Sequence, residues 1–154
     1  QFSQSGGTGG FNFWPNVIPF PGQPTLSITT ADKVGIGTDS PKSTLKVNGS
    51  MAGNFVPTVL PYTCTPKDYF VFVTAPGAGG VTLPLANSVD AGSVLIVRNN
   101  IAASISVNIQ GPDLIFPLDF GGTQVSVTVG CPGACGMPAS RRFISDGLAR
   151  WIEW

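Results

Sequence analysis

The chain has 154 residues, of which 42% are hydrophobic and 10% are charged, and its eight basic and eight acidic residues cancel. The lack of a run of lysine or arginine argues against a nucleic-acid partner, because phosphate binding needs a basic surface. No histidine is present, which excludes Ser–His and Cys–His nucleophile pairs and removes the usual ligand of catalytic zinc. No apolar run approaches the roughly 18–20 residues that a membrane-spanning helix needs. We therefore expect no enzyme activity, no metal or cofactor, and no membrane insertion.

The first 24 residues are expected to form a linker and an extended aromatic segment. Residues 1–10 have the glycine, serine, glutamine and threonine composition of a flexible linker, and Gln1 at the start suggests a processed chain or an excised fragment. Residues 11–22 combine aromatic rings with prolines, which disfavour both a helix and a central strand. Trp14 in this segment is a candidate for stacking on a sugar ring. The alternative is packing of the segment within an assembly of identical chains.

Residues 25–51 are expected to form a short collar. After an alternating strand at 26–30, the sequence V-G-I-G-T over 34–38 and L-K-V over 45–47 predicts two very short strands, joined by a turn-rich hinge and followed by an Asn-Gly turn. So little apolar surface cannot form a core within one chain. The pattern V-G-I-G-T-x-x-P-x-x-x-L-x-V-x-G resembles the collar of trimeric phage tail fibres and related bacterial surface fibres. The resemblance implies a homotrimer.

Residues 52–154 are expected to form a distal domain of short strands. Glycine and proline total 34 residues, 20 and 14, and many of them punctuate this region as turns. The strand spacing predicts an all-β fold, a small sandwich, roll or prism, in which residues 85–89 are at most one helical turn. The expected strands are 69–74, 81–83, 93–99, 104–109, 114–116, 124–129, 142–145 and 150–154.

The order of short motifs in this domain resembles a β module common in tail fibres. The chain reads D-Y-F-V-F-V over 68–73, V-T-L-P over 81–84, R-N at 98–99, V-S-V over 125–127 and S-D-G over 145–147, with a closing tryptophan at Trp151. Together with the collar, the resemblance covers residues 34–154. It implies a distal segment of an extracellular homotrimeric fibre, with Trp151 in the core. Trp154 is left open as an interface residue, an exposed platform or a disordered residue.

Two departures from this module are the expected places for ligand binding. Residues 130–142 form an insertion, and inserted loops on a β scaffold often carry binding residues. Met137, Arg141 and Arg142 are the candidates there, because an arginine pair suits a carboxylate or phosphate on a cell-surface glycan. The alternative is a solvated pair without a ligand. The second departure is the apolar stretch 114–120 with Phe116 and Phe120, for which the alternative is packing at a trimer axis.

The three cysteines allow more than one arrangement. Cys131 and Cys135 flank a Pro-Gly turn and are expected to form a small disulfide, which leaves Cys64 over. A bridge from one of them to Cys64, or three buried free thiols, are the alternatives. Without histidine a zinc site is not expected.

The interpretation is a trimeric fibre tip that recognises a host or prey cell through a surface receptor, expected to be a glycan, by multivalent contacts. The first alternative is a purely structural neck that only trimerises. A polysaccharide depolymerase fragment is less favoured. Two carboxylates suffice for glycoside hydrolysis, and Asp113 with Asp119 or Asp146 with Glu153 are available. However, Asp113 and Asp146 lie in turns, where aspartate typically accepts hydrogen bonds from the backbone.

Overall fold

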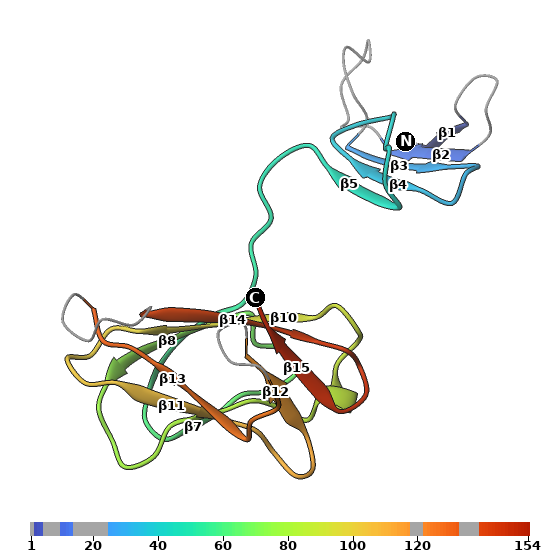
Figure 1. The fold of residues 1–154 in the computed structure, drawn as a ribbon. Coiled ribbons are helices and arrows are strands. Elements are labelled where there is room, and N and C mark those ends of the chain that lie inside the picture. Colours follow the sequence, from blue (N-terminus) through green and yellow to red (C-terminus); the bar gives the residue numbers. More distant parts are fainter. Residues whose placement is uncertain (1, 5–9, 14–24, 118–121, 133–138) are drawn as a thin grey trace. The chain divides into compact units, whose positions relative to one another are not determined.

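The computed structural model describes residues 2–4, 10–13, 25–117, 122–132 and 139–154. These residues form three β-sheets, and the only helical element among them is one 3-10 turn, η1 (Ala86–Ser88). The predictions of an all-β fold and of no more than one turn at residues 85–89 are confirmed. In the part of the chain described, no helix is long and apolar enough to cross a membrane. The chain divides into two compact units, Gln1–Ala52 and Gly53–Trp154 (Figure 1).

The first unit is built on one five-stranded sheet, sheet A, in the order β1-β2-β3-β4-β5. Neighbouring strands are antiparallel except β4 and β5, which are parallel. The expected linker over residues 1–10 contains strand β1, and β2 ends before the first proline of the aromatic segment, so the prolines do not prevent its pairing. The strands are β1 (Phe2–Gln4), β2 (Gly10–Phe13), β3 (Leu26–Thr29), β4 (Val34–Ile36) and β5 (Leu45–Val47).

Two of the three glycines of the collar motif, Gly35 and Gly37, serve different purposes. Gly35 is packed so closely that an added Cβ would lie 2.6 Å from Ser27 Oγ and would overlap the carbonyl oxygen of Thr38. That same carbonyl accepts a hydrogen bond of 2.7 Å from Ser27 Oγ. Gly37 has a φ of +67°, a conformation that favours glycine, and its carbonyl accepts a hydrogen bond from Asn48 Nδ2. The expected Asn-Gly turn closes no hairpin, because β5 pairs in parallel with β4 and the chain then leaves the sheet.

The second unit contains two sheets. Sheet B has the order β12-β15-β14-β10-β8-β6, and sheet C has the order β13-β11-β9-β7. The two sheets form two layers (Figure 1). The strands are β6 (Phe55–Val59), β7 (Tyr62–Thr63), β8 (Phe70–Ala75), β9 (Val81–Thr82), β10 (Val94–Asn99), β11 (Ile105–Asn108), β12 (Leu114–Phe116), β13 (Ser126–Val129), β14 (Ser140–Ser145) and β15 (Arg150–Glu153).

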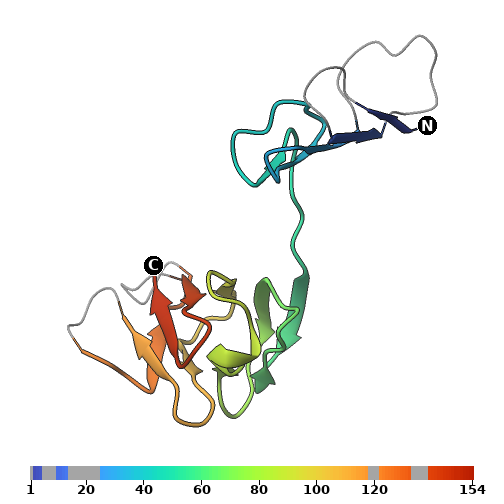
Figure 2. The same ribbon diagram turned by 90° about the vertical axis from the view of Figure 1, so that its right-hand side faces the viewer.

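The first six strands of this unit alternate between the two sheets, so the chain winds as a coil. Strands β6, β8 and β10 are parallel neighbours in sheet B, and β7, β9 and β11 are parallel neighbours in sheet C. Each pass of the chain therefore adds one strand to each layer (Figure 2). Strands β13 and β14 then pair antiparallel to β11 and β10. The pattern of short strands did not predict this parallel winding.

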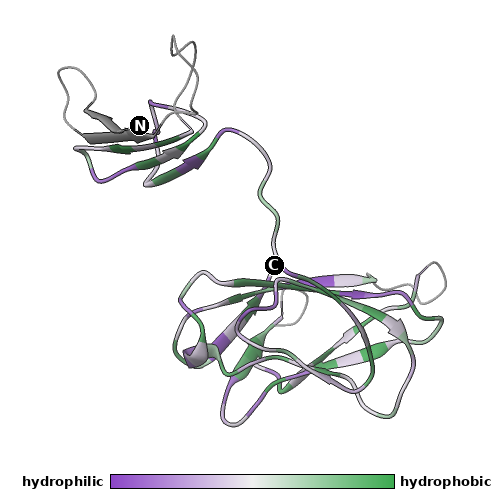
Figure 3. Cartoon of the chain, turned by 180° about the vertical axis from the view of Figure 1, so that it is seen from behind, coloured by the Kyte–Doolittle hydropathy of each residue, from purple (hydrophilic) through white to green (hydrophobic). Residues whose placement is uncertain are grey.

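The core lies between sheets B and C. Alternate residues of each strand point into it, so hydrophobic residues recur along the strands of both sheets (Figure 3). Trp151 is 1% exposed, and its Nε1 donates a hydrogen bond of 3.0 Å to the carbonyl of Pro84. The prediction that Trp151 belongs to the core is confirmed.

Strand β6 was not expected from the sequence. It contains Pro57, which lacks the N–H needed inside a sheet. The structure places β6 at the edge of sheet B, where proline is tolerated.

Candidate binding face on sheet B

Sheet B has one face turned to the core and one face that no described segment of its unit covers, which we call the outer face. On β14 the residues alternate between buried and accessible, and β15 shows the same alternation. The accessible positions of the six strands are mostly apolar or basic. They include Phe55, Pro57, Phe70, Phe72, Val94, Ile96, Arg98, Leu114, Phe116, Arg142, Ile144, Arg150 and Ile152, and Trp154 follows β15.

One row of the outer face ends in a tryptophan–arginine pair. Phe70 is in register with Ile96, and Ile96 is in register with Arg142. Trp154 N donates a hydrogen bond of 3.0 Å to the carbonyl of Arg142. The guanidinium carbon of Arg142 lies 5.3 Å from the centre of the Trp154 ring, which is a cation–π contact. The side chain of Trp154 is nevertheless 66% exposed, so much of the ring remains available.

A second pair lies on the neighbouring strands. Phe116 of β12 is in register with Ile152 of β15, and the guanidinium carbon of Arg150 lies 5.2 Å from the centre of the Phe116 ring. Because β15 lies between β12 and β14, the fold brings the candidates Phe116 and Arg142 onto one face from distant parts of the sequence. We call Phe116, Arg142, Arg150, Ile152 and Trp154 the arginine–aromatic cluster.

The two segments that depart from the fibre module adjoin this cluster. Strand β12 belongs to the second departure and ends at Phe116, beside Ile152. Strand β14 begins at Ser140 and carries Arg142 beside Trp154. Met137, Phe120 and Trp14, the other candidates from the sequence, lie outside the described residues.

Arg141 lies on the opposite side of β14 from Arg142. It is 7% exposed, its Nε donates a hydrogen bond of 2.7 Å to the carbonyl of Thr128, and its Nη1 forms an ion pair with Glu153 Oε1. A solvated arginine pair was one expectation from the sequence, and the structure separates the two residues because neighbouring residues of a strand point to opposite faces. Arg141 therefore belongs to the interior, and of these two arginines only Arg142 lies on the outer face.

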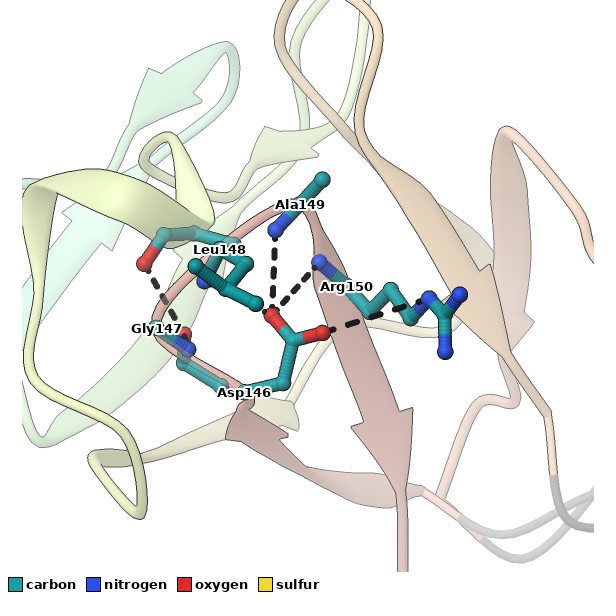
Figure 4. A network of polar contacts seen from close by, with 7 residues as sticks. Asp146, Gly147, Leu148, Ala149 and Arg150 are labelled. Carbon is teal, nitrogen blue, oxygen red and sulfur yellow. Dashed lines mark hydrogen bonds and ion pairs between the residues drawn. The ribbon is translucent and has the colours of Figure 1, made fainter.

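Of the four carboxylates considered for hydrolysis, Asp113 and Asp146 have backbone partners and Glu153 is buried, whereas Asp119 lies outside the described residues. Asp146 Oδ1 accepts hydrogen bonds from the backbone amides of Leu148, Ala149 and Arg150 at 2.8–3.0 Å (Figure 4). The bond from Leu148 is the largest of the causes that lower the pKa of Asp146. Asp113 is buried and accepts a hydrogen bond of 2.6 Å from the amide of Ala86. Both aspartates accept hydrogen bonds from the backbone, as expected of aspartates in turns. The partner of Asp113, Ala86, lies far from it along the chain.

Two of the three cysteines are described. Cys64 is a buried free thiol, which contradicts the alternative of a bridge to Cys64. Burial raises the pKa of Cys64 to about 12, with a smaller contribution from the negative charge of Asp68. Cys131 is disulfide-bonded, and Cys135 lies outside the described residues, so the pairing of these two stays a prediction. Within the described ranges, no group of three histidine, cysteine or acidic residues is placed to hold a metal ion.

Sequence reasoning did not single out Arg150 and Ile152, and it left the role of Trp154 open. The period-two spacing of these three residues was the available signal, because it places them on one side of a strand whose other side holds Trp151. No family model matches the sequence, and comparisons with curated proteins and with solved structures find no match either. The resemblance to fibre modules therefore rests on the quoted motifs.

Proposed function

We propose that the chain is the receptor-binding segment of an extracellular homotrimeric fibre, and that the arginine–aromatic cluster binds a cell-surface glycan. The observation that carries this proposal is the exposed Trp154 ring beside the Arg142 guanidinium. A flat indole suits the apolar face of a pyranose, and its apolar surface is otherwise left in water. A guanidinium supplies directional donors for sugar oxygens. Arg142 lies on strand β14, and Trp154 directly follows β15 and is tied to β14 by its backbone hydrogen bond to Arg142, which holds these groups more firmly than a loop does.

The trimeric part of the proposal is supported by sheet A. The hinge between β4 and β5 packs on one face of β3 and β4: Ser27 and Gly35 on that face are buried, as are Thr38 and Pro41 in the hinge. The opposite face carries aliphatic side chains in two registered rows, and three of them are 39–51% exposed. A single sheet with an open apolar face needs a partner to be stable in water. The two rows are Leu26–Ile36–Val47 and Ile28–Val34–Leu45.

A further copy of the chain is the natural partner for this face. Identical sheets have identical apolar faces, and closed symmetric assembly buries all of them at once. Three copies on one fibre then present three equivalent binding sites. Their combined residence on a cell exceeds that of each site through effective concentration, so the individual affinity can be low.

A structural neck is the second candidate function, because the open face of sheet A supports trimerisation whether or not a ligand exists. The two functions separate on a glycan array probed with the full chain. Receptor binding predicts retention without release of reducing sugar, and Trp154→Ala should abolish this retention. The matched control is Val125→Ala, an exposed apolar side chain outside sheet B, which should bind like the parent.

Each outcome of this experiment has a defined meaning. An assembled trimer retained on no glycan supports the neck and contradicts receptor binding. Retention that Trp154→Ala leaves unchanged contradicts the assignment of the site to sheet B. Release of reducing sugar contradicts a purely binding role.

A further inference from the structure

The outer face of sheet B is basic, although the chain as a whole is neutral. Arg98, Arg142 and Arg150 occupy accessible positions on it, whereas the accessible positions of all six described strands hold no aspartate or glutamate. The acidic residue of β15, Glu153, points into the core instead. This segregation of charge is independent of the aromatic character on which the proposed function rests.

We infer that the ligand of this face is an acidic glycan, a pyranose that carries a carboxylate. The inference rests on the proposed function and specifies the class of sugar. The pyranose ring stacks on Trp154, and the carboxylate accepts hydrogen bonds from Arg142.

Arg142 is the primary anchor because its charge has no carboxylate partner among the described residues. Its guanidinium contacts the Trp154 ring, and a cation–π contact does not consume the N–H donors of a guanidinium. Those donors form a fork that matches the two oxygens of a carboxylate. A neutral sugar leaves this fork without an anionic acceptor.

The other two arginines are less available. Arg150 Nε lies 3.9 Å from Asp146 Oδ2, which offsets part of its charge. Arg98 is half-buried in register with Phe72 and Ser140. They contribute to the positive potential of the face, while Arg142, beside the Trp154 ring, contacts the carboxylate of the ligand directly.

The test is retention of the full-length assembled protein on immobilised polysaccharides. The probes are polysialate and polygalacturonate, the carboxyl-reduced form of each, and poly(glycerol phosphate) as an anion without a sugar ring. We expect retention on at least one of the two acidic polymers and about 10-fold weaker binding to its carboxyl-reduced form, the effect of losing a hydrogen bond to a charged group.

The variants separate a specific fork from general charge attraction. Arg142→Gln should weaken binding to the acidic polymer about 10-fold, and Arg142→Lys should restore only part of it because an ammonium has no planar fork. Lys67→Gln removes the same charge from an exposed position outside sheet B, and it should bind like the parent.

Four results would overturn the inference. Equal retention on the acidic and carboxyl-reduced polymers assigns a neutral glycan and leaves the proposed function standing. No retention on any of the four sugar polymers counts against both the acidic ligand and the proposed function. Equal retention on poly(glycerol phosphate) shows attraction to anions without sugar recognition. Loss of the assembly in Arg142→Gln or Trp154→Ala, measured by sedimentation, shows that another copy of the chain covers this face.

Discussion

Arg141 and Arg142 are neighbours in the sequence with opposite environments. Arg141 is buried in an ion pair with Glu153, while Arg142 lies on the outer face beside Trp154. Replacing Glu153 by Leu removes this carboxylate from the buried guanidinium of Arg141, and we expect a loss of about 3–5 kcal/mol in the free energy of unfolding. Arg142→Gln should change it by less than about 0.5 kcal/mol. Urea unfolding measures both values.

A second pair of changes checks the cause of that loss. The double variant Arg141→Met with Glu153→Leu removes both charges together, so it should recover much of the stability lost in Glu153→Leu. The ion-pair explanation is contradicted if the double variant is less stable than the single one.

Cys64 should be chemically inert in the folded protein. Its thiol is buried and its pKa is raised to about 12, so almost none of it is the reactive thiolate at pH 8. Alkylation at pH 8 should label no cysteine in the folded chain, and alkylation after unfolding without reductant should label Cys64 alone if Cys131 and Cys135 are bridged. Intact mass counts the labels, and three labels per unfolded chain would refute the disulfide.

At the scale of single elements, the turn before β15 should be sensitive to acid. The folded-state pKa of Asp146 is lowered, first by the hydrogen bond from Leu148. The unfolded chain therefore binds this proton more readily, so the stabilisation is present above the unfolded pKa of about 3.9 and is lost as the pH falls through the folded pKa. Asp146→Asn should melt below the parent at pH 7, and the difference should disappear in that acidic range. Asp90→Asn removes a carboxylate from another exposed turn and is the control.

The collar offers a matched pair of glycines. A methyl group on Gly35 meets Ser27 and Thr38, whereas nothing lies within 4 Å of the corresponding position on Gly49. Gly35→Ala should destabilise the first unit by about 1–3 kcal/mol, and Gly49→Ala should be close to neutral. Hydrogen exchange of the amides in β3 and β4 measures the stability of the first unit directly. Equal protection in the two variants would show that the close packing at Gly35 is not required.

At the scale of the whole molecule, association is expected to depend on the open face of sheet A. Ile36 is 43% exposed on that face, and an aspartate there would place an unpaired charge in the contact between copies. Ile36→Asp should shift sedimentation toward the 15.9 kDa chain, whereas Lys46→Asp, on the opposite face of the same sheet, should not. A parent protein that sediments as a monomer at micromolar concentration would contradict the trimer.

The strand pattern and several core positions could be predicted from the sequence. The resemblance to the fibre module placed Trp151 inside, and the alternating pattern predicted strands at 93–99 and 150–154 that agree closely with β10 and β15. Alternation is a local property of an extended chain, so it can be read without knowing the partners of a strand. The predicted start of the strand at 142–145 was wrong. Strand β14 begins at Ser140, so Arg141 lies within the strand and points inward.

The binding face and the winding of the coil depended on contacts far apart in the sequence. Arg142 and Phe116 were candidates from the sequence, but their place on one face follows from the order β12-β15-β14, which also adds Arg150 and Trp154. In the same way, β6 exists as a strand because β8 pairs with it at the edge of sheet B. Which strands become neighbours depends on how the two sheets close over a shared core, and short strands carry too little local information to specify that pairing.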